Sequence, residues 1–238
     1  YYRFFEELEN AIEVLTSYNS RTSEPYLEDY DYIYNGNVGN WIKFANTLRL
    51  RLAMRISYVD QTKAETEAKA AIDHSIGLMT SVSDNAVLKQ SVSFSFINEW
   101  WEAYESFNDF RMSATMDCYL KGLQDPRLAA YFKVAKKDGE YHGVRNGQTS
   151  RSQGTLSEAA SSMNVGQASS ILWMDAAETY FLLAEAKLRL NLGDKTVKEY
   201  YEEGVKTSFS SKGASGAESY LDNDVNVPSI SFIDPTNG

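Results

Sequence analysis

Two adjacent tryptophans lie at the centre of the strongest candidate ligand site in the sequence. They belong to the segment NEWWEAYESFND, which also places a tyrosine and two asparagines close by along the predicted helix. Proteins hold sugars with aromatic faces that cover apolar C–H surfaces and with planar polar side chains that hydrogen-bond hydroxyl groups. The residue types of this segment therefore suit a sugar, and the candidate ligand-binding cluster consists of Asn98, Trp100, Trp101, Tyr104 and Asn108.

Ordinary packing is the alternative interpretation of this cluster. Adjacent residues on a helix point about 100° apart, so Trp100 and Trp101 do not both face the centre of a core. Tryptophan is often largely buried, and one ring of such a pair can belong to the core while the other is a partly covered surface residue. The binding hypothesis therefore requires that at least one of the two rings be exposed.

Two further segments carry aromatic and polar side chains that suit a sugar. In GEYHGVRNG, a solvated turn with a structural arginine competes with a binding loop. In EDYDYIYNGN, packing competes with binding for each of the alternating tyrosines Tyr30, Tyr32 and Tyr34. From the first segment we keep Tyr141, His142 and Arg145 as candidate ligand-binding residues.

The sequence predicts no metal site and no cofactor. His74 and His142 are far apart and neither belongs to a cluster of zinc ligands. The segment DNDVNV places Asp222, Asp224 and Asn226 like the first ligands of a calcium loop. Valine then replaces the glycine at the sixth position and isoleucine the glutamate at the twelfth, so the calcium pattern is incomplete.

Catalytic patterns are also weak. Glu178 and Glu185 share a predicted helix face and resemble a glycosidase pair, but any helix surface supplies such pairs. Arg189, four residues further on, offers Glu185 a salt partner. We find no P-loop, dinucleotide fingerprint or nucleophile elbow in the sequence. We therefore expect a binding protein and not an enzyme.

Charge and composition narrow the partners. The chain has 238 residues and a net charge of −10, from 33 acidic and 23 basic side chains. Such a chain repels nucleic acid and anionic lipid, so neither is expected as a ligand. No apolar run is long enough to span a bilayer. The chain opens inside a helical pattern without an initiating methionine, and we expect it to be an excerpt from a longer protein.

The elements that position the candidate residues are predicted to be helices. Two helix pairs share one plan, in which a longer helix with apolar residues on two faces is followed by a tight turn and a shorter amphipathic helix. Each pair approaches the roughly 34-residue tetratricopeptide unit. The pairs are 41–57 with 62–76 and 169–193 with 194–209. Helices are also predicted at 1–15, at 97–123 with a break near Asn108, and at 125–132; loops are predicted at 24–40 and 137–168.

The helix at 41–57 explains why a repeat unit needs neighbours. Its apolar stripe includes Trp41 and Leu48, which we expect to be buried, while Leu50 lies on the opposite side. Arg49 and Arg51 lie at the borders, where their stems can cover apolar surface and their guanidinium groups can reach water or a partner carboxylate. Stacked units bury both faces of such a helix, so we predict an all-α, tetratricopeptide-like scaffold that forms a single domain over residues 1–238.

Local signals set the expected ends of the paired helices. Thr62 and Glu65 resemble a capping box, and Asp194 is the expected N-cap of the last helix. Trp173 is expected in the core, within the helix at 169–193.

Four segments together resemble the SusD/RagB family, the nutrient-binding lipoproteins of Bacteroidetes outer membranes. They occur in the order of the family's subgroup with a tetratricopeptide-like core, and the resemblance covers essentially the whole chain. The lipidated N-terminal cysteine of the family is absent, since Cys118 lies in mid-chain, and a further C-terminal helical part is missing. The segments are NWIKFANTLRLRLAMRIS, NDFRMSATMDCYLKGLQDPRLAAYF, YHGVRNG and MDAAETYFLLAEAKLRLNLGDKTVKEYYEEGVKTSF.

The resemblance implies a protein at the cell surface, anchored in the outer membrane by a lipid in its full-length form. It implies capture of oligosaccharides, or sometimes peptides, for a SusC-like TonB-dependent transporter, without catalysis. A helical-repeat scaffold that binds a peptide or protein is the second hypothesis.

Overall fold

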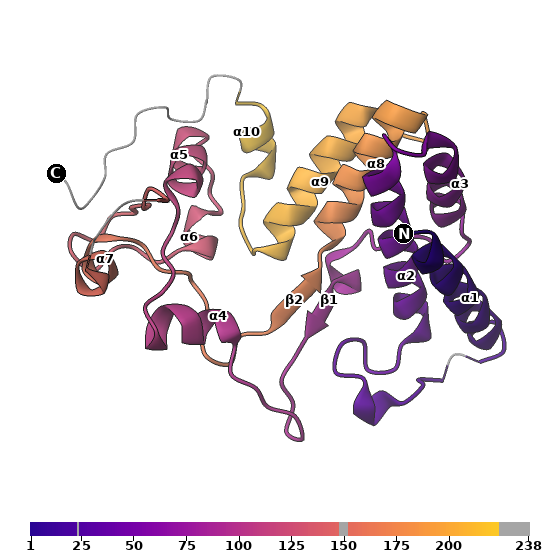
Figure 1. Cartoon of the computed structure of the whole chain (residues 1–238), viewed down its shortest axis with the longest axis horizontal. Helices are drawn as coiled ribbons and strands as arrows, with labels where there is room; N and C mark the ends of the chain where they lie inside the picture. The colour runs from indigo at the N-terminus through magenta and orange to yellow at the C-terminus, as the bar shows by residue number, and fades with distance from the viewer. Residues whose placement is uncertain (23, 148–151, 224–238) are drawn as a thin grey trace. The chain divides into compact units, whose positions relative to one another are not determined.

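The computed structural model describes residues 1–22, 24–147 and 152–223, and these residues are mostly helical (Figure 1). Contacts divide the chain into two compact units. Unit 1 combines Tyr1–Phe94 with Ile171–Ser211, and unit 2 combines Ser95–Ser170 with the chain from Lys212 onward. The prediction of an all-α protein is confirmed. That residues 1–238 form one domain stays a prediction.

Unit 1 holds the long helices and one small β-ribbon, in which β1 pairs antiparallel with β2. In chain order its elements are α1 (Tyr2–Asn19), η1 (Glu28–Tyr30), α2 (Val38–Ile56), α3 (Gln61–Ile72), η2 (Val82–Asp84), β1 (Ala86–Leu88), β2 (Ile171–Met174), α8 (Ala176–Leu190) and α9 (Val197–Ser211).

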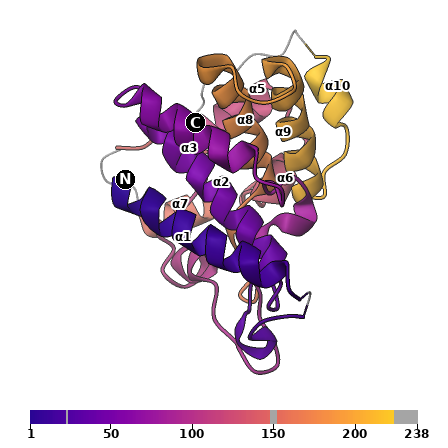
Figure 2. The same ribbon diagram turned by 90° about the vertical axis from the view of Figure 1, so that its right-hand side faces the viewer.

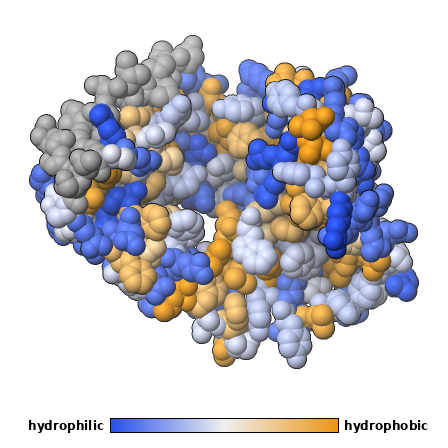
Figure 3. Space-filling view, in the orientation of Figure 1, coloured by the Kyte–Doolittle hydropathy of each residue, from blue (hydrophilic) through white to orange (hydrophobic). Residues whose placement is uncertain are grey.

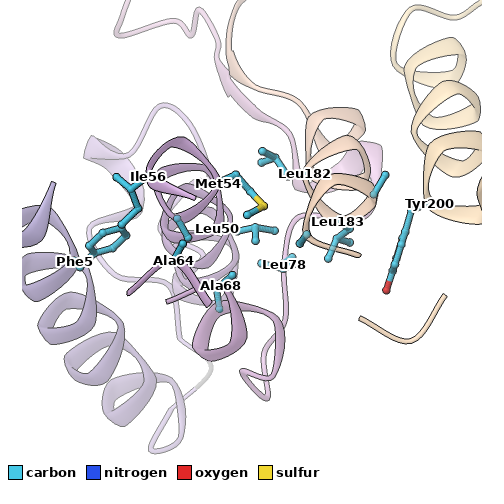
Figure 4. Packing of buried hydrophobic residues seen from close by; sticks show 14 residues of the cluster. Phe5, Leu50, Met54, Ile56, Ala64, Ala68, Leu78, Leu182, Leu183 and Tyr200 are labelled. Carbon is cyan, nitrogen blue, oxygen red and sulfur yellow. The ribbon is translucent and has the colours of Figure 1, made fainter. Parts of the chain in front are cut away.

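Two helical hairpins form the body of unit 1. Helix α2 packs on α3, α8 packs on α9, and α2 also contacts both α8 and α1 (Figures 1 and 2). The predicted pairing of the helices is therefore confirmed. Leu50 and Met54 of α2 are buried in one cluster with Leu182 and Leu183 of α8 (Figure 4). Helix α2 is therefore packed on two sides, as its two apolar faces predicted.

Charged pairs inside unit 1 account for two arginines of α2, Arg49 and Arg51. Arg49 is 7% exposed, and its Nε donates to Glu67 at 2.5 Å, while Lys63 reaches the same carboxylate at 2.7 Å. Arg51 forms a bidentate pair with Glu178, with both N–O distances at 2.6 Å. Burial alone would raise the pKa of Glu67, but the bonds from Lys63 and Arg49 outweigh it and lower that pKa. The predicted carboxylate partners are confirmed.

The expected burial of Trp41 and Leu48 was wrong. Both are only half-buried, and the most deeply buried face of α2 instead includes Ile42, Asn46 and Arg49. The prediction from the apolar stripe did not expect Asn46 and Arg49 to be buried, because their side chains are polar. Each finds an internal partner: Asn46 Nδ2 donates to the carbonyl of Gly77 at 3.0 Å, although its buried Oδ1 accepts no hydrogen bond, and Arg49 meets Glu67. Paired polar groups of this kind can be buried at little cost.

Several predicted helix ends also need correction. Helix α3 is capped by Asp60, whose side chain accepts from the N–H of Lys63, and not by Thr62 with Glu65. Helix α9 begins after Thr196, which exchanges hydrogen bonds with Glu199 in a capping box, and not at Asp194. In both places a neighbouring polar residue was the better-placed acceptor.

The helix predicted from residue 169 begins later, because Ile171–Met174 forms strand β2 and Asp175 then caps α8. Trp173 is therefore on a strand and 54% exposed, so its expected place in the core was wrong.

Unit 2 is built from short helices joined by long connections. The expected break near Asn108 is confirmed by its positive φ of 57°. The segment 137–168, predicted as a loop, contains the helix α7. The elements are α4 (Glu99–Trp101), the π-helix η3 (Glu102–Ser106), α5 (Ala114–Gly122), α6 (Leu128–Tyr131), α7 (Gln153–Ala159) and α10 (Ala217–Leu221).

Candidate aromatic binding site

An asparagine fixes the backbone that carries the two tryptophans. Asn98 is 2% exposed and caps α4: its Oδ1 accepts from the N–H groups of Trp100 at 3.0 Å and Trp101 at 3.3 Å. Its Nδ2 donates to the carbonyl of Ser169 at 3.0 Å. These bonds use the amide for structure, so the predicted contact of Asn98 with a ligand is replaced by a positioning role.

Trp100 is the exposed member of the tryptophan pair. It is 51% exposed, whereas Trp101 is half-buried. The ring of Trp100 meets the ring of Phe110 edge to face, with centroids 5.9 Å apart, and Phe110 is itself 46% exposed. In the space-filling view, hydrophobic side chains reach the surface around α4 among hydrophilic ones (Figure 3). Such an aromatic pair presents an apolar face in a polar surround, as sugar stacking requires.

Tyr104 is buried and is not part of this surface. It is fully buried, its hydroxyl donates to the carbonyl of Val165, and Lys133 donates to that hydroxyl at 3.1 Å. The residue lies in the π-helical turn η3, a type of irregularity found often near functional sites. Full burial removes Tyr104 from the residues that can touch a ligand.

Arg111 holds the chain between the tryptophans and Phe110. Its guanidinium donates to the carbonyl of Phe110 at 2.5 Å and to Oδ1 of Asn108 at 2.8 Å. Burial lowers the pKa of Arg111, with a nearby glutamate acting in the opposite direction. The side chain of Asn108 is thus bonded to Arg111, and its backbone makes the turn there with a positive φ.

The residues Tyr141, His142 and Arg145 lie in a different part of unit 2. Tyr141 packs against the cluster of Met112, Leu120 and Phe132, and His142 Nε2 lies 2.9 Å from Asp138. Arg145 is exposed. Within the described ranges, no hydrogen bond or ring contact joins Tyr141 or His142 to Trp100. The structure therefore does not bring the two predicted groups into one cluster.

The tyrosines of residues 30–34 divide between surface and core. Tyr30 is 77% exposed, Tyr32 stacks on Phe94 with ring centroids 4.3 Å apart, and Tyr34 is buried with its hydroxyl bonded to the carbonyl of Asp84 at 2.8 Å. Packing therefore explains Tyr32 and Tyr34.

Metal binding and membrane crossing find no support among the described residues. No group of three or more His, Cys, Asp or Glu side chains in that part could hold a metal ion. The predicted calcium pattern lies mostly outside it, because Asp224 and Asn226 fall beyond residue 223. No helix of the described ranges is long and apolar enough to cross a membrane.

The sequence reasoning missed Phe107 and Phe110, which are 58% and 46% exposed. Both flank Asn108, and a helix break there was predicted. A signal was therefore present: apolar rings beside a break leave the helical stripe and have no assured place in the core.

A helical-repeat scaffold with an exposed aromatic pair defines a class of binding protein, and comparison identifies its family. Residues 1–238 match the SusD-like family, described as the SusD and RagB outer membrane lipoproteins. The chain belongs to this family. Its members are substrate-binding lipoproteins and not enzymes. No curated protein matches the chain.

Solved structures support the same assignment. The chain is 37% identical to a chitin-binding SusD homologue from Flavobacterium johnsoniae, with a TM-score of 0.88 over 94% of this chain and 46% of that one. A SusD homologue from Bacteroides uniformis is 36% identical, with a TM-score of 0.88 over 100% and 49%. One from Bacteroides thetaiotaomicron is 34% identical, with a TM-score of 0.89 over 100% and 49%. The chain thus spans about half the length of these structures.

Proposed function

We propose that the full-length protein binds a neutral oligosaccharide at the cell surface, and that Trp100 with Phe110 forms the stacking face of its site. The observation that carries the proposal is the exposed edge-to-face pair on a segment fixed by Asn98 and Arg111. A pre-organised aromatic face loses little conformational freedom when a sugar stacks on it.

The charges near this face indicate which sugars fit. Glu99, Glu105 and Asp109 are exposed and adjoin the aromatic residues in the chain. Carboxylates repel uronic acids and sulfated sugars, so a neutral glycan is the favoured class. The chitin-binding homologue from Flavobacterium johnsoniae supports this choice, because chitin is built from neutral sugars. Trp101, Tyr141, His142 and Arg145 remain proposed secondary contacts with the ligand.

The setting of the function follows from the family. Outer-membrane lipoproteins of this kind suit delivery of captured sugar to a SusC-like TonB-dependent transporter, and we propose that partner here. Co-purification of the full-length protein with a TonB-dependent transporter tests this step. A protein isolated from its outer membrane without any such transporter would contradict it.

Substitution of Trp100 tests the site. A glycan array on the full-length protein first identifies neutral ligands, and calorimetry then measures the affinity of the best one. We expect Trp100→Ala to weaken binding by about 1–3 kcal/mol, the scale of one aromatic stacking contact, because the ring covers the sugar face. The thermal midpoint should stay within a degree or so of the wild type, since a half-exposed ring contributes little to folding.

A matched control comes from Tyr119, a 52% exposed aromatic residue on α5 of the same unit. Tyr119→Ala removes a comparable ring and should leave affinity unchanged. Equal losses from both substitutions, or none from Trp100→Ala, would show that the binding site lies elsewhere.

A further inference from the structure

The connection between α1 and α2 encloses a pocket that the aromatic site does not use. Its volume is about 430 Å³, within the range of small-ligand pockets. It lies entirely in unit 1, with walls from the end of α1, from residues 24–25 and from residues 34–38. In Figure 1 this connection, drawn in purple, lies at the lower ends of the two helices.

Polar side chains with unused hydrogen-bonding capacity line this pocket. The amides of Asn19 and Asn35 and the carboxylate of Glu24 make no hydrogen bond or ion pair within the described ranges, although all three border the pocket. Asn37 uses its Oδ1 to accept the N–H of Asn40 at 3.0 Å, and its Nδ2 remains as a donor. The amides of Asn19 and Asn35 each offer both donors and an acceptor, the combination that a sugar hydroxyl needs.

The apolar part of the pocket consists of Pro25, Val38 and the ring of Tyr34. Tyr34 is 7% exposed, and its hydroxyl is fixed by the carbonyl of Asp84. A lining that combines apolar side chains with amides suits the two surfaces of a sugar ring, since its C–H face is apolar and its rim carries hydroxyls.

The pocket is held in shape before any ligand arrives. Asp31 accepts hydrogen bonds from the N–H groups of Tyr34 at 3.1 Å and Gly36 at 2.8 Å and from Nε1 of Trp41 at 2.7 Å. Gly36 has a φ of 76°, and a Cβ there would come within 2.7 Å of the carbonyl oxygen of Tyr26. Only glycine allows this close crossing of the loop. A preformed site loses less free energy to ordering when it binds.

We infer that this pocket is a second carbohydrate subsite, which takes one unit of a neutral glycan through the free amides of Asn19 and Asn35. Glu24 is the only charged side chain among the lining residues, so an anionic sugar is disfavoured. The inference shares its ligand class with the proposed function but rests on separate residues in the other unit.

The test uses the full-length protein and three neutral probes, namely chitohexaose, cellohexaose and maltohexaose, with affinity measured by calorimetry. Asn35 has a φ of 51°, and Asn35→Gly removes the amide while keeping that backbone conformation accessible. The matched control is Asn191→Gly, at an exposed asparagine with a φ of 53° that ends α8. Each variant is made in the wild type and in Trp100→Ala.

We expect Asn35→Gly to weaken at least one probe about fivefold in both backgrounds, the scale of one lost hydrogen bond, while Asn191→Gly changes no probe by more than about twofold. Glu24→Ala, a second variant at the pocket, should weaken the same probe. Equal affinities for Asn35→Gly and Asn191→Gly with every probe, or no binding of any probe by the wild type, would overturn the inference.

The outcomes separate this subsite from the aromatic one. Loss from Trp100→Ala alone supports the aromatic site and rejects the second subsite. Loss from Asn35→Gly alone supports the second subsite and rejects the aromatic one.

Discussion

A buried ion pair in unit 1 and a group of exposed aromatic rings in unit 2 both depart from the ordinary preference of their residue kinds. In unit 1, Arg49 and Glu67 are 7% and 3% exposed and are joined at 2.5 Å. In unit 2, Trp100, Phe107 and Phe110 are each about half exposed. The two departures have different physical explanations.

Buried charges need partners, and partners fix geometry. Arg49 and Glu67 join α2 to α3, and Arg51 with Glu178 joins α2 to α8, so the ion pairs set how the hairpins stack. Exposed aromatic rings satisfy no such need and gain nothing for folding. The ion pairs therefore stabilise the helical hairpins of unit 1, whereas the exposed rings of unit 2 stay available for contact with a ligand, as binding residues on irregular segments often are.

The largest effect is expected inside unit 2, where the ring of Tyr104 is buried and the ring of Trp100 is exposed. Tyr104→Ala should lower the free energy of unfolding by about 3–5 kcal/mol, because it empties a fully buried site and leaves the carbonyl of Val165 without its donor. Urea unfolding of the full-length protein measures this loss, with Trp100→Ala as the exposed control. Similar stabilities for the two variants would remove the distinction between support and surface.

A comparable effect is expected from breaking the buried pair of unit 1. Arg49→Met should cost about 3–5 kcal/mol of unfolding free energy, because Glu67 keeps only Lys63 as a charged partner. Arg55→Met, at an exposed position of the same helix, should change stability by no more than about 0.5 kcal/mol. The double variant Arg49→Met with Glu67→Met should recover most of the loss, since two apolar side chains can replace a buried pair. If the double variant does not recover this free energy, the ion pair stabilises unit 1 more than two apolar side chains can.

The third prediction concerns the two leucines of α2. Leu50 is 0% exposed, while Leu48 is half-buried and borders an apolar surface pocket with Phe4 and Leu8. Leu50→Ala should cost about 2–5 kcal/mol in urea unfolding. Leu48→Ala should cost about half as much or less, because part of its surface is already in water. Equal losses of unfolding free energy would show that Leu48 is buried as deeply as Leu50, as the sequence alone predicted.

The helical scaffold was predictable because helix periodicity repeats over many residues. The pairs α2–α3 and α8–α9 and the two-sided packing of α2 follow from apolar spacing summed over several turns. Which face of α2 is buried most deeply was not predictable. That face depends on partners for Asn46 and Arg49, namely Gly77 and Glu67, which lie elsewhere in the chain. Periodicity assigns polar residues to the surface and cannot see such pairing.

The candidate site was predictable only in its centre. Two adjacent tryptophans on a helix forced one ring outward, and Trp100 is that ring. The roles of Asn98 and Tyr104 depend on contacts with Ser169 and Val165, about 60–70 residues away in sequence, so composition alone gave them the wrong place. Strand β2 exposed Trp173 for a related reason, since four residues are too few for a period to distinguish strand from helix.

The smallest expected effect concerns the N-cap of α9, a local interaction that does not depend on core packing. Thr196 accepts the N–H of Glu199 at 3.2 Å, and Glu199 Oε2 accepts the N–H of Thr196 at 2.7 Å, so the two close a capping box at the start of α9. Thr196→Ala should lower the unfolding free energy by about 1 kcal/mol, because one N–H of the first turn loses its acceptor. Asp194→Ala is the control: its carboxylate accepts from the hydroxyl of Tyr200 at 2.7 Å and caps no helix. Hydrogen exchange of the amide of Glu199 gives the site-specific readout, and it should speed up in Thr196→Ala and stay near the wild-type rate in Asp194→Ala. The reverse order would place the cap at Asp194, as the sequence had suggested, and would show that the hairpin turn and not the helix end stabilises α9.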